Sequence, residues 1–271
     1  MSKFQAVIKH ILLIIMTFIM FIPLYSVFVM GTYYSEDIFK GIPVFPSDYL
    51  LENLKTVFKA NFTQAYGNSL FISVFSVILS VLSSSMMGFA LAKYKFRLRK
   101  FLFAMLMVIM MIPGQISMIG FIREMKVVGL LNTHLPLIIT WMAYPFGTFF
   151  MTQFIRDSLP TEVMESGRLD GCSEPGIYFK IVLPFIKPGL LTLATLVFLS
   201  SWNSYMMPLL ILNKQELYTI PLMVSTLSTQ FRTDYGATMA ALSIAILPMI
   251  LIFVLCSKTF IRGIAAGAVK G

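Results

Sequence analysis

The residue types that most often hold metals or attack substrates are few and scattered in this sequence. Its cysteines are Cys172 and Cys256, and its histidines are His10 and His134. None of these four residues has a neighbour at the spacing of a metal-ligand pair, and no nucleophile is paired with a base in the sequence. We therefore expect no metal site and no catalytic residue, with both cysteines present as unpaired thiols.

A phosphate-binding loop is also missing from the sequence. The nearest match to GxxxxGK[ST] runs from Gly171 to Gly176, but Ile177 and Tyr178 follow where a lysine and a hydroxyl residue are required. The lysine of such a loop contacts the phosphates of the nucleotide. We therefore expect no cofactor site in this chain and no ATP hydrolysis by it.

The longest charged stretch, residues 156–187, has the chemistry of two short helices. It reads RDSLPTEVMESGRLDGCSEPGIYFKIVLPFIK. Glutamates near its start complement the positive end of a helix, and Gly171 suits the left-handed position that often follows a helix. Ser173 can then cap a second helix. The pattern predicts a helix near 160–170, a glycine bend and a second short helix.

The remaining chain is apolar enough to need a bilayer. Hydrophobic residues make up 58% of the sequence and charged residues 12%, whereas soluble domains average about 25% charged residues. Six stretches without Asp, Glu, Lys or Arg are long enough to cross a hydrocarbon core of about 30 Å. The sequence thus predicts an all-α membrane protein with a single transmembrane domain over residues 1–271, whose six transmembrane helices lie near 11–31, 70–92, 102–122, 135–155, 190–212 and 238–257.

Three details of these stretches predict local structure. Pro113 with Gly114, Pro145 and Pro208 fall within or near apolar runs, and proline kinks a helix because it lacks an N–H group. Small residues at 83–85 and 88 permit close contact between helices. A shorter charge-free stretch, 217–231, carries many hydroxyl side chains and is expected to be interfacial or re-entrant rather than a full span.

The distribution of charge predicts the orientation of the chain. With six spans and a cytoplasmic N-terminus, 14 of the 21 basic residues and five of the 12 acidic residues lie on the cytoplasmic side. The whole formal charge of +9 then falls on that side, as the positive-inside rule requires. Both termini are therefore expected to be cytoplasmic. Because no predicted span holds an acid or a base, an ion-coupled carrier is disfavoured.

The stretch 156–187 resembles the EAA loop of ABC importer permeases. That family has a glutamate, two small residues, a glycine six positions after the glutamate, and then isoleucine-x-leucine-proline. This chain carries matching residues at the same spacing: Glu165, Ser166, Gly167, Leu169, Asp170, Gly171, Ile181, Leu183 and Pro184. The departure is Ser166 and Gly167 where two alanines are usual. Both are small, so another protein could still approach the backbone of that face closely.

Outside the loop, the chain resembles the smaller permease of the maltose-type carbohydrate importers. The weaker matches are Asn68 with Ser69, 88–93, 130–133, Trp202 with Asn203 and Pro208, 218–221 and 265–271. The resemblance implies a prokaryotic, multi-pass cell-membrane permease that pairs with a second homologous permease. It also implies two copies of a cytoplasmic ATPase that bind ATP and Mg²⁺, an extracytoplasmic solute-binding protein and a sugar substrate, with no nucleic acid.

The resemblance assigns the loop 156–187 to coupling with the ATPase, through a coupling helix between the fourth and fifth spans. In that role Glu165 is expected to meet a partner arginine, and Gly171 to form the bend. Sugars are held by aromatic faces and by amide or hydroxyl groups. The candidates for the substrate pathway are Gln115, Trp141, Trp202, Asn203 and Tyr205. The segment 33–67 is expected to face the binding protein or to cap the bundle.

Two alternatives remain open from the sequence. One is an ABC permease for an amino acid, a peptide or a polyamine. The other is a self-sufficient six-helix channel or facilitator, which would not explain the EAA-like spacing in residues 156–187.

Overall fold

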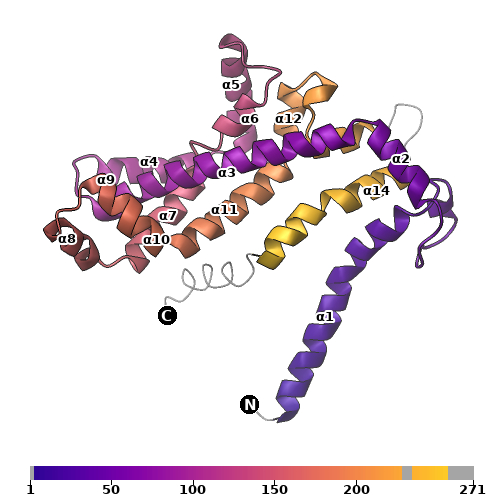
Figure 1. Ribbon diagram of the computed structural model, residues 1–271, viewed down its shortest axis with the longest axis horizontal. Helices are drawn as coiled ribbons and strands as arrows, with labels where there is room; N and C mark the ends of the chain where they lie inside the picture. The colour runs from indigo at the N-terminus through magenta and orange to yellow at the C-terminus, as the bar shows by residue number, and fades with distance from the viewer. Residues whose placement is uncertain (1–2, 228–233, 256–271) are drawn as a thin grey trace. The chain divides into compact units, whose positions relative to one another are not determined.

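In the computed structural model of this protein, residues 3–227 and 234–255 are described, and their regular elements are all helices (Figure 1). The predicted all-α class is confirmed for these residues. Cys256 and the match at 265–271 lie outside them. The described residues divide into two compact units, one formed by those of 3–66 and 220–248, and the other by those of 67–219 and 249–255.

The first unit pairs the N-terminal helix with the helix that begins at Tyr235. Its elements are α1 (Lys3–Met30), η1 (Asp37–Lys40), α2 (Leu50–Lys59), α13 (Ile220–Thr226) and α14 (Tyr235–Ala245). Helix α14 packs against both α1 and α2. The apolar side chains of α1 from Val7 to Leu24 are exposed, as expected for a helix whose solvent is lipid, whereas Val29 near its end is buried.

A network of hydrogen bonds fixes the chain after α1. Asn53 of α2 is buried, and its amide donates to the carbonyls of Gly31 and Tyr33 at 2.9 and 2.8 Å. Ser35 donates to the carboxylate of Asp234 at 2.6 Å, and that carboxylate caps α14. Residues 33–53 are thus tied to their own unit. The expected role of segment 33–67, toward a binding protein or as a cap of the bundle, stays a prediction.

The second unit contains most of the predicted spans and the loop 156–187. Helix α3 (Phe62–Lys93) enters it from the first unit, and the elements that follow are α4 (Arg99–Met111), α5 (Gly114–Val127), α6 (Leu135–Ile139), α7 (Pro145–Ser158), α8 (Thr161–Leu169), α9 (Glu174–Ile177), η2 (Tyr178–Val182), α10 (Leu183–Phe185), α11 (Lys187–Trp202), α12 (Met206–Ile211) and η3 (Gln215–Leu217). Helix α7 packs against α4 and α11.

Helices α3 and α7 approach each other through small residues, as the sequence predicts. A Cβ atom added to Gly88 would lie 2.8 Å from Cβ of Met151, and one added to Gly147 would lie 2.6 Å from Oγ of Ser84. Both distances are below van der Waals contact. The two backbones can therefore be this close only because glycine occupies positions 88 and 147.

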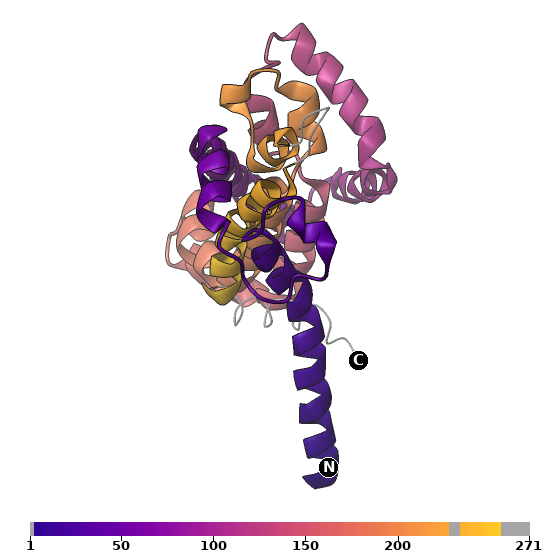
Figure 2. The ribbon, with the colours of Figure 1, turned by 90° about the vertical axis from the view of Figure 1, so that its right-hand side faces the viewer.

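Helices are interrupted within three of the predicted spans, at 102–122, 135–155 and 190–212, the runs in which the sequence predicts proline kinks. The first is broken at Ile112 and Pro113 with a 101° bend between α4 and α5 (Figure 2). The second is broken over residues 140–144, between α6 and α7. The third is broken over residues 203–205, between α11 and α12.

Proline explains two of the breaks directly. A proline cannot donate to the preceding turn, and it forces the residue before it out of the helical region. Accordingly Ile112 before Pro113 has ψ of 125°, and Tyr144 before Pro145 has ψ of 101°. The sequence signal for kinks was correct, but proline here separates helices instead of bending them.

The described helices long and apolar enough to cross a bilayer alone are Val7–Met30 of α1, α3, and the stretch Tyr235–Leu255 that contains α14. Two more candidates are bent pairs, α4 with α5 and Glu174–Phe185 with α11. The six crossings therefore stay a prediction.

Helix α13 has seven residues and is too short to span a bilayer. Because 228–233 lie outside the described residues, the interpretation of 217–231 as interfacial or re-entrant also stays a prediction.

Two glycines of α3 provide a matched test of the contact between α3 and α7. We expect Gly88→Ala to lower stability by about 1–3 kcal/mol, the usual range for overpacking, because its new methyl group meets Met151. A methyl group at Gly67 meets nothing within 4 Å. Gly67→Ala should therefore leave the melting temperature of the purified protein unchanged or slightly raised. Equal melting temperatures for the two variants would contradict the close contact.

Candidate functional site

Residues 160–186 form a helix–glycine–helix unit, called here the protrusion. Helix α8 ends in a Schellman motif, in which Cys172 N–H donates to Gly167 O at 3.0 Å and Gly171 N–H to Arg168 O at 3.1 Å. Gly171 has φ of +78°, a conformation that favours glycine. The hydroxyl of Ser173 accepts from Gly176 N–H and caps α9. The predicted helices, glycine bend and cap are all present.

One face of the protrusion is open. Glu165, Ser166, Leu169, Asp170 and Gly171 are exposed, and Leu169 is 89% exposed. Leu169 lies between Arg168 and Asp170, and an apolar side chain exposed to this degree among charged residues is suited to contact another protein. These five residues are called the docking face below.

Gly167 and Ile181 do not belong to that open face, which corrects the expectation that Gly167 offers its backbone to a partner. Gly167 is buried, and a Cβ atom there would lie 2.6 Å from Cδ1 of Ile181. Leu183 is half-buried and packs against the core, while Pro184 is exposed in the first turn of α10. The motif residues after α9 therefore shape the inner side of the protrusion.

The inner side of the protrusion is continuous with the apolar core of the second unit. Met164 of α8 and Ile177 of α9 are almost fully buried, together with Val182 and Ile186. They form one cluster with residues of three long helices: Phe89 and Ala92 of α3, Met151 and Ile155 of α7, and Leu193 and Val197 of α11. A force applied to the protrusion therefore reaches all three helices through packed side chains.

Polar contacts fasten the protrusion to the C-terminal end of α3, beyond its covalent links to α7 and α11. The ammonium of Lys93 donates to the carbonyl of Leu159, just before α8. The Tyr94 hydroxyl donates to the carboxylate of Glu174, which also forms an ion pair with Arg168 at 2.7 Å. The hydroxyls of Ser85 and Tyr178 lie 2.7 Å apart.

The pKa values of Tyr94 and Glu174 reflect this arrangement, and both residues lie outside the long apolar helices. Burial raises the pKa of Tyr94, and its hydrogen bond to Glu174 raises it further. The hydrogen bond from Arg168, followed by that from Tyr94, holds the pKa of Glu174 below its usual value. At neutral pH, Tyr94 therefore stays protonated and Glu174 stays ionised, as the hydrogen bond between them requires.

The contribution of the contacts among Tyr94, Glu174 and Arg168 to local stability can be tested without a transport assay. Exposed ion pairs contribute about 0.2–1 kcal/mol, so Glu174→Gln should raise amide hydrogen exchange in residues 161–177 by about 1.5- to 5-fold. Glu52→Gln removes a comparable exposed pair with Lys55 in the first unit and should leave this exchange unchanged. Identical exchange in residues 161–177 for wild type and Glu174→Gln would show that these contacts do not stabilise the protrusion.

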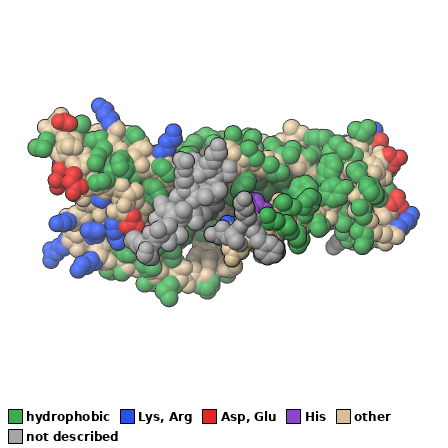
Figure 3. Space-filling view, turned by 90° about the horizontal axis from the view of Figure 1, so that it is seen from below, with side chains coloured by type: hydrophobic (Ala, Val, Ile, Leu, Met, Phe, Trp, Pro, Cys, Tyr) green, Lys and Arg blue, Asp and Glu red, His purple; other side chains and the backbone are tan. Residues whose placement is uncertain are grey.

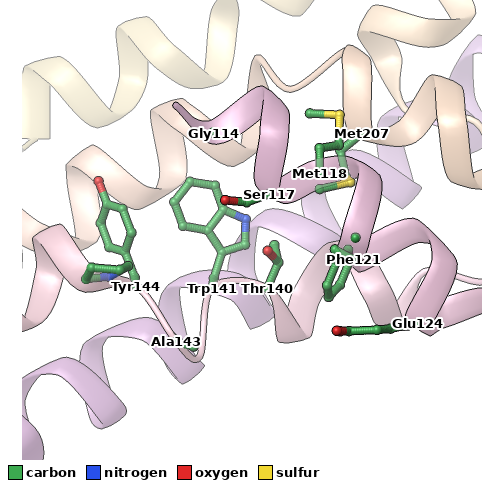
Figure 4. Close-up of a pocket in the computed structure, with 12 residues that line it drawn as sticks. Gly114, Ser117, Met118, Phe121, Glu124, Thr140, Trp141, Ala143, Tyr144 and Met207 are labelled. Carbon is green, nitrogen blue, oxygen red and sulfur yellow. The ribbon is translucent and has the colours of Figure 1, made fainter. Parts of the chain in front are cut away.

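A cavity lies at the break between α6 and α7 in the second unit. It has a volume of about 520 Å³ and is lined by residues from α5, from the break between α6 and α7, and from α12: Gly114, Ser117, Met118, Gly120, Phe121, Glu124, Thr140, Trp141, Ala143, Tyr144, Pro145 and Met207 (Figure 4). Non-helical backbone at membrane depth is tolerated where it lines a cavity or lies inside protein. The break between α6 and α7 lines such a cavity.

A second, smaller cavity of about 220 Å³ shares Met118, Thr140, Trp141 and Met207 with the first. The residues that line only the smaller cavity are Ile72, Leu137, Ser201, Ser204, Pro208 and Thr219. Discontinuous helices of this kind form the substrate sites of many membrane transporters. The shared wall makes Trp141 and Thr140 the central residues of this region.

The structure places one of the five predicted pathway residues, Trp141, in these cavities. Gln115 is exposed beside the first break and lines neither cavity. Trp202 is buried and stacks on Phe198 at 5.5 Å between ring centres. Asn203 and Tyr205 lie in the break between α11 and α12 but outside both cavities, and Asn203 donates to Leu199 O at 2.8 Å.

Sequence reasoning missed the residues that hold the segment 213–218. Asn132 has φ of +61°, and its side-chain oxygen accepts from the backbone N–H groups of Asn213 and Lys214 at 2.9 and 3.1 Å. Nε2 of His134 lies 2.9 Å from Leu217 O. The amide of Asn68 donates to the carbonyls of Glu216 and Tyr218 at 2.8 and 3.1 Å.

These contacts bring together three of the weaker sequence matches, at Asn68, at 130–133 and at 218–221. Each match looked isolated in the sequence. Asparagine side chains readily form hydrogen bonds with backbone groups. The asparagines in these matches could therefore have suggested that the matches lie close together.

Comparison with known proteins agrees with this arrangement. The family described as "Binding-protein-dependent transport system inner membrane component" matches residues 81–266. The chain is 38% identical over 232 residues to the arabinooligosaccharides transport system permease protein AraQ of Halalkalibacterium halodurans, covering 83% of this chain and 81% of AraQ. It is 30% identical over 274 residues to the diacetylchitobiose uptake system permease protein DasC of Streptomyces coelicolor, covering 100% of this chain and 99% of DasC.

A solved structure shares the fold. A chain in the crystal structure of a bacterial ABC transporter involved in the import of the acidic polysaccharide alginate superposes with a TM-score of 0.83 at 21% identity, over 96% of this chain and 99% of that chain. The family match covers more than half of the sequence and includes the protrusion and the helix breaks. This chain belongs to the family of binding-protein-dependent transport system inner membrane components.

Proposed function

We propose that this chain is the permease subunit of an ATP-driven ABC importer for a sugar or an oligosaccharide. The observation that carries the proposal is the protrusion, whose open docking face is fused by its inner side to the core of the apolar bundle. The cargo is inferred from the relatives, whose names specify arabinooligosaccharides, diacetylchitobiose, and melibiose, raffinose and stachyose. No phosphate-binding loop occurs in the sequence, so the energy must come from a partner.

The proposed topology has six crossings with both termini in the cytoplasm. The crossings are α1, α3, the pair α4 and α5, the pair α6 and α7, the pair α11 and α12, and the helix that begins with α14. Support comes from the basic residues of 93–100 and of the protrusion, which lie on the same side in this topology. Figure 3 shows Lys and Arg side chains, with several Asp and Glu side chains among them, at the end of the second unit that holds α8 and α9.

The proposed partners are a second homologous permease, two copies of an ABC ATPase and an extracytoplasmic solute-binding protein. The ATPase subunits bind ATP and Mg²⁺ and contact the docking face, where Glu165 meets a basic side chain of the ATPase. Exposed apolar side chains on α3 and α4, such as Phe75 and Met105, are available for lipid and for the second permease. The family description already states that this component works with a binding protein.

The mechanism we propose is mechanical. Closure of the two ATPase subunits on ATP displaces the docking face. Because Met164, Ile177 and Tyr178 are packed against α3, α7 and α11, the protrusion and these helices move as one body. The movement is carried to the helix breaks, where the cavities open alternately toward the two sides of the membrane. The chain itself performs no chemical step.

The alternatives are less well supported. A self-sufficient channel has no need of a docking face joined to three helices. A permease for amino acids, peptides or polyamines would be expected to place charged side chains along the pathway. Glu124 is the single Asp, Glu, Lys or Arg among the described residues that line the two cavities.

The test is ATP-dependent sugar uptake by the complete transporter in proteoliposomes, with Gly171→Asp as the critical variant. Aspartate tolerates positive φ and has free space at position 171, so the variant should fold and insert. Its carboxylate adds a buried, unpaired charge to the interface with the ATPase. We expect co-purification of the ATPase and uptake to fall together by 10-fold or more.

The control for that experiment is Gly171→Asn, which keeps the backbone geometry and adds no charge. It should retain most of the uptake. Wild-type uptake that requires no ATPase, or Gly171→Asp uptake equal to that of wild type, would contradict the proposed function.

A further inference from the structure

The smaller cavity of the second unit contains a hydroxyl group without a hydrogen-bond partner. Thr219 is 4% exposed, and its Oγ1 is fully buried with no partner among the described residues. It lines the cavity of about 220 Å³ together with Trp141 and two serines, Ser201 and Ser204. Because buried polar groups are nearly always paired, an unpaired hydroxyl beside an empty volume indicates a missing ligand.

The unpaired hydroxyl is held in place by its neighbours. Thr219 directly follows the segment whose backbone carbonyls are bonded by Asn68 and His134. Asn132 holds the start of the same segment through the N–H groups of Asn213 and Lys214. With its preceding residues anchored at several points, Thr219 has little freedom to turn its hydroxyl toward solvent. The side chains of Asn68, Asn132 and His134 thus keep the Thr219 hydroxyl in the cavity.

The lining indicates the chemical class of the ligand. Four hydroxyl-bearing residues line the cavity, Thr140, Ser201, Ser204 and Thr219, and none of the residues that line it is ionisable. A charged amino or carboxylate group would be desolvated there without a counter-ion. Trp141 supplies an aromatic surface on the wall shared with the larger cavity, as Figure 4 shows for the larger cavity. Hydroxyl groups beside an aromatic face suit a neutral, polyhydroxylated ring.

We infer that the smaller cavity binds one neutral sugar ring of the cargo, with the hydroxyl of Thr219 bonded to a sugar hydroxyl and the indole of Trp141 against the ring. The larger cavity, which shares Trp141 and Thr140, then receives the adjoining part of an oligosaccharide. This inference rests on the proposed function and adds to it a binding site within this chain, at residues that the EAA-like motif does not include.

The critical variant is Thr219→Val, which keeps the shape of the side chain and removes its hydroxyl. The complete transporter, with its ATPase, second permease and binding protein, is reconstituted in proteoliposomes, and uptake of raffinose, an arabinooligosaccharide mixture and diacetylchitobiose is measured. The loss of one neutral hydrogen bond predicts a decrease of about 2- to 10-fold in the uptake rate of the sugar that wild type transports. Thr219→Ser, which retains the hydroxyl, should keep uptake within 2-fold of wild type.

A second measurement separates binding from stability. Removing an unpaired buried hydroxyl does not weaken the sugar-free protein, so the melting temperature of the purified transporter should be unchanged or higher in Thr219→Val. Thr195→Val is the matched control, because Thr195 is buried but its hydroxyl is bonded to Leu191 O at 2.8 Å within α11. Its uptake should stay within 2-fold of wild type.

The outcomes are distinct. Equal uptake by Thr219→Val and wild type would overturn the sugar site and leave the proposed function standing. A lower melting temperature in Thr219→Val would also overturn it, since the hydroxyl would then have a structural partner. If wild type shows no ATP-dependent uptake of any of the three probes, the proposed function itself fails for these sugars, and the site fails with it.

Discussion

The structure depends on the packing of the protrusion against the ends of three long helices. Met164 and Ile177 are inserted among Phe89 of α3, Ile155 of α7 and Val197 of α11. An interior packed in this way transmits displacement because it has little room to deform. Without this contact, α8 and α9 would be a loop on the membrane surface, and movement of a partner would not reach the helices. Gly167 permits the contact by letting Ile181 lie directly on α8.

The attachment of α3 has a consequence for the mechanism. Helices α7 and α11 are joined to the protrusion by the chain, so their movement with it is expected from connectivity alone. Helix α3 is joined through side chains: Ser85 to Tyr178, Lys93 to Leu159, and Tyr94 to Glu174. It is also in close contact with α7 at Gly88. We therefore expect helix α3 to move with the protrusion, although the chain does not join the two directly.

The sequence was informative where backbone geometry and spacing decide the structure. Gly171 predicted the left-handed end of α8, and Ser173 predicted the cap of α9, because few residues satisfy these positions. The apolar runs located the long helices but could not show that three of them are broken. A charge-free run looks the same whether it is one helix or two, and only Pro113 and Pro145 marked the interruptions.

The cavities could not be predicted because they depend on which breaks meet in space. Trp141 was selected for its aromatic ring, yet Trp202 satisfied the same criterion and is packed in the core. Thr219 belongs to the match at 218–221, but that match did not indicate a cavity: the position of Thr219 depends on Asn68 and His134, which lie about 150 and 85 positions away in the chain and hold the segment before it. Such contacts join residues that no local pattern connects.

The central claim is that the docking face of the protrusion contacts a nucleotide-driven partner. The most direct measurement places a photo-crosslinking amino acid at position 169, whose leucine is 89% exposed, in the complete transporter within membranes. The account predicts a crosslink to the ATPase whose yield changes between ATP-bound and nucleotide-free states, and no ATPase crosslink from position 127, where Val127 at the end of α5 is 81% exposed. A crosslink from position 169 to the solute-binding protein or to lipid, with none to the ATPase, would contradict it.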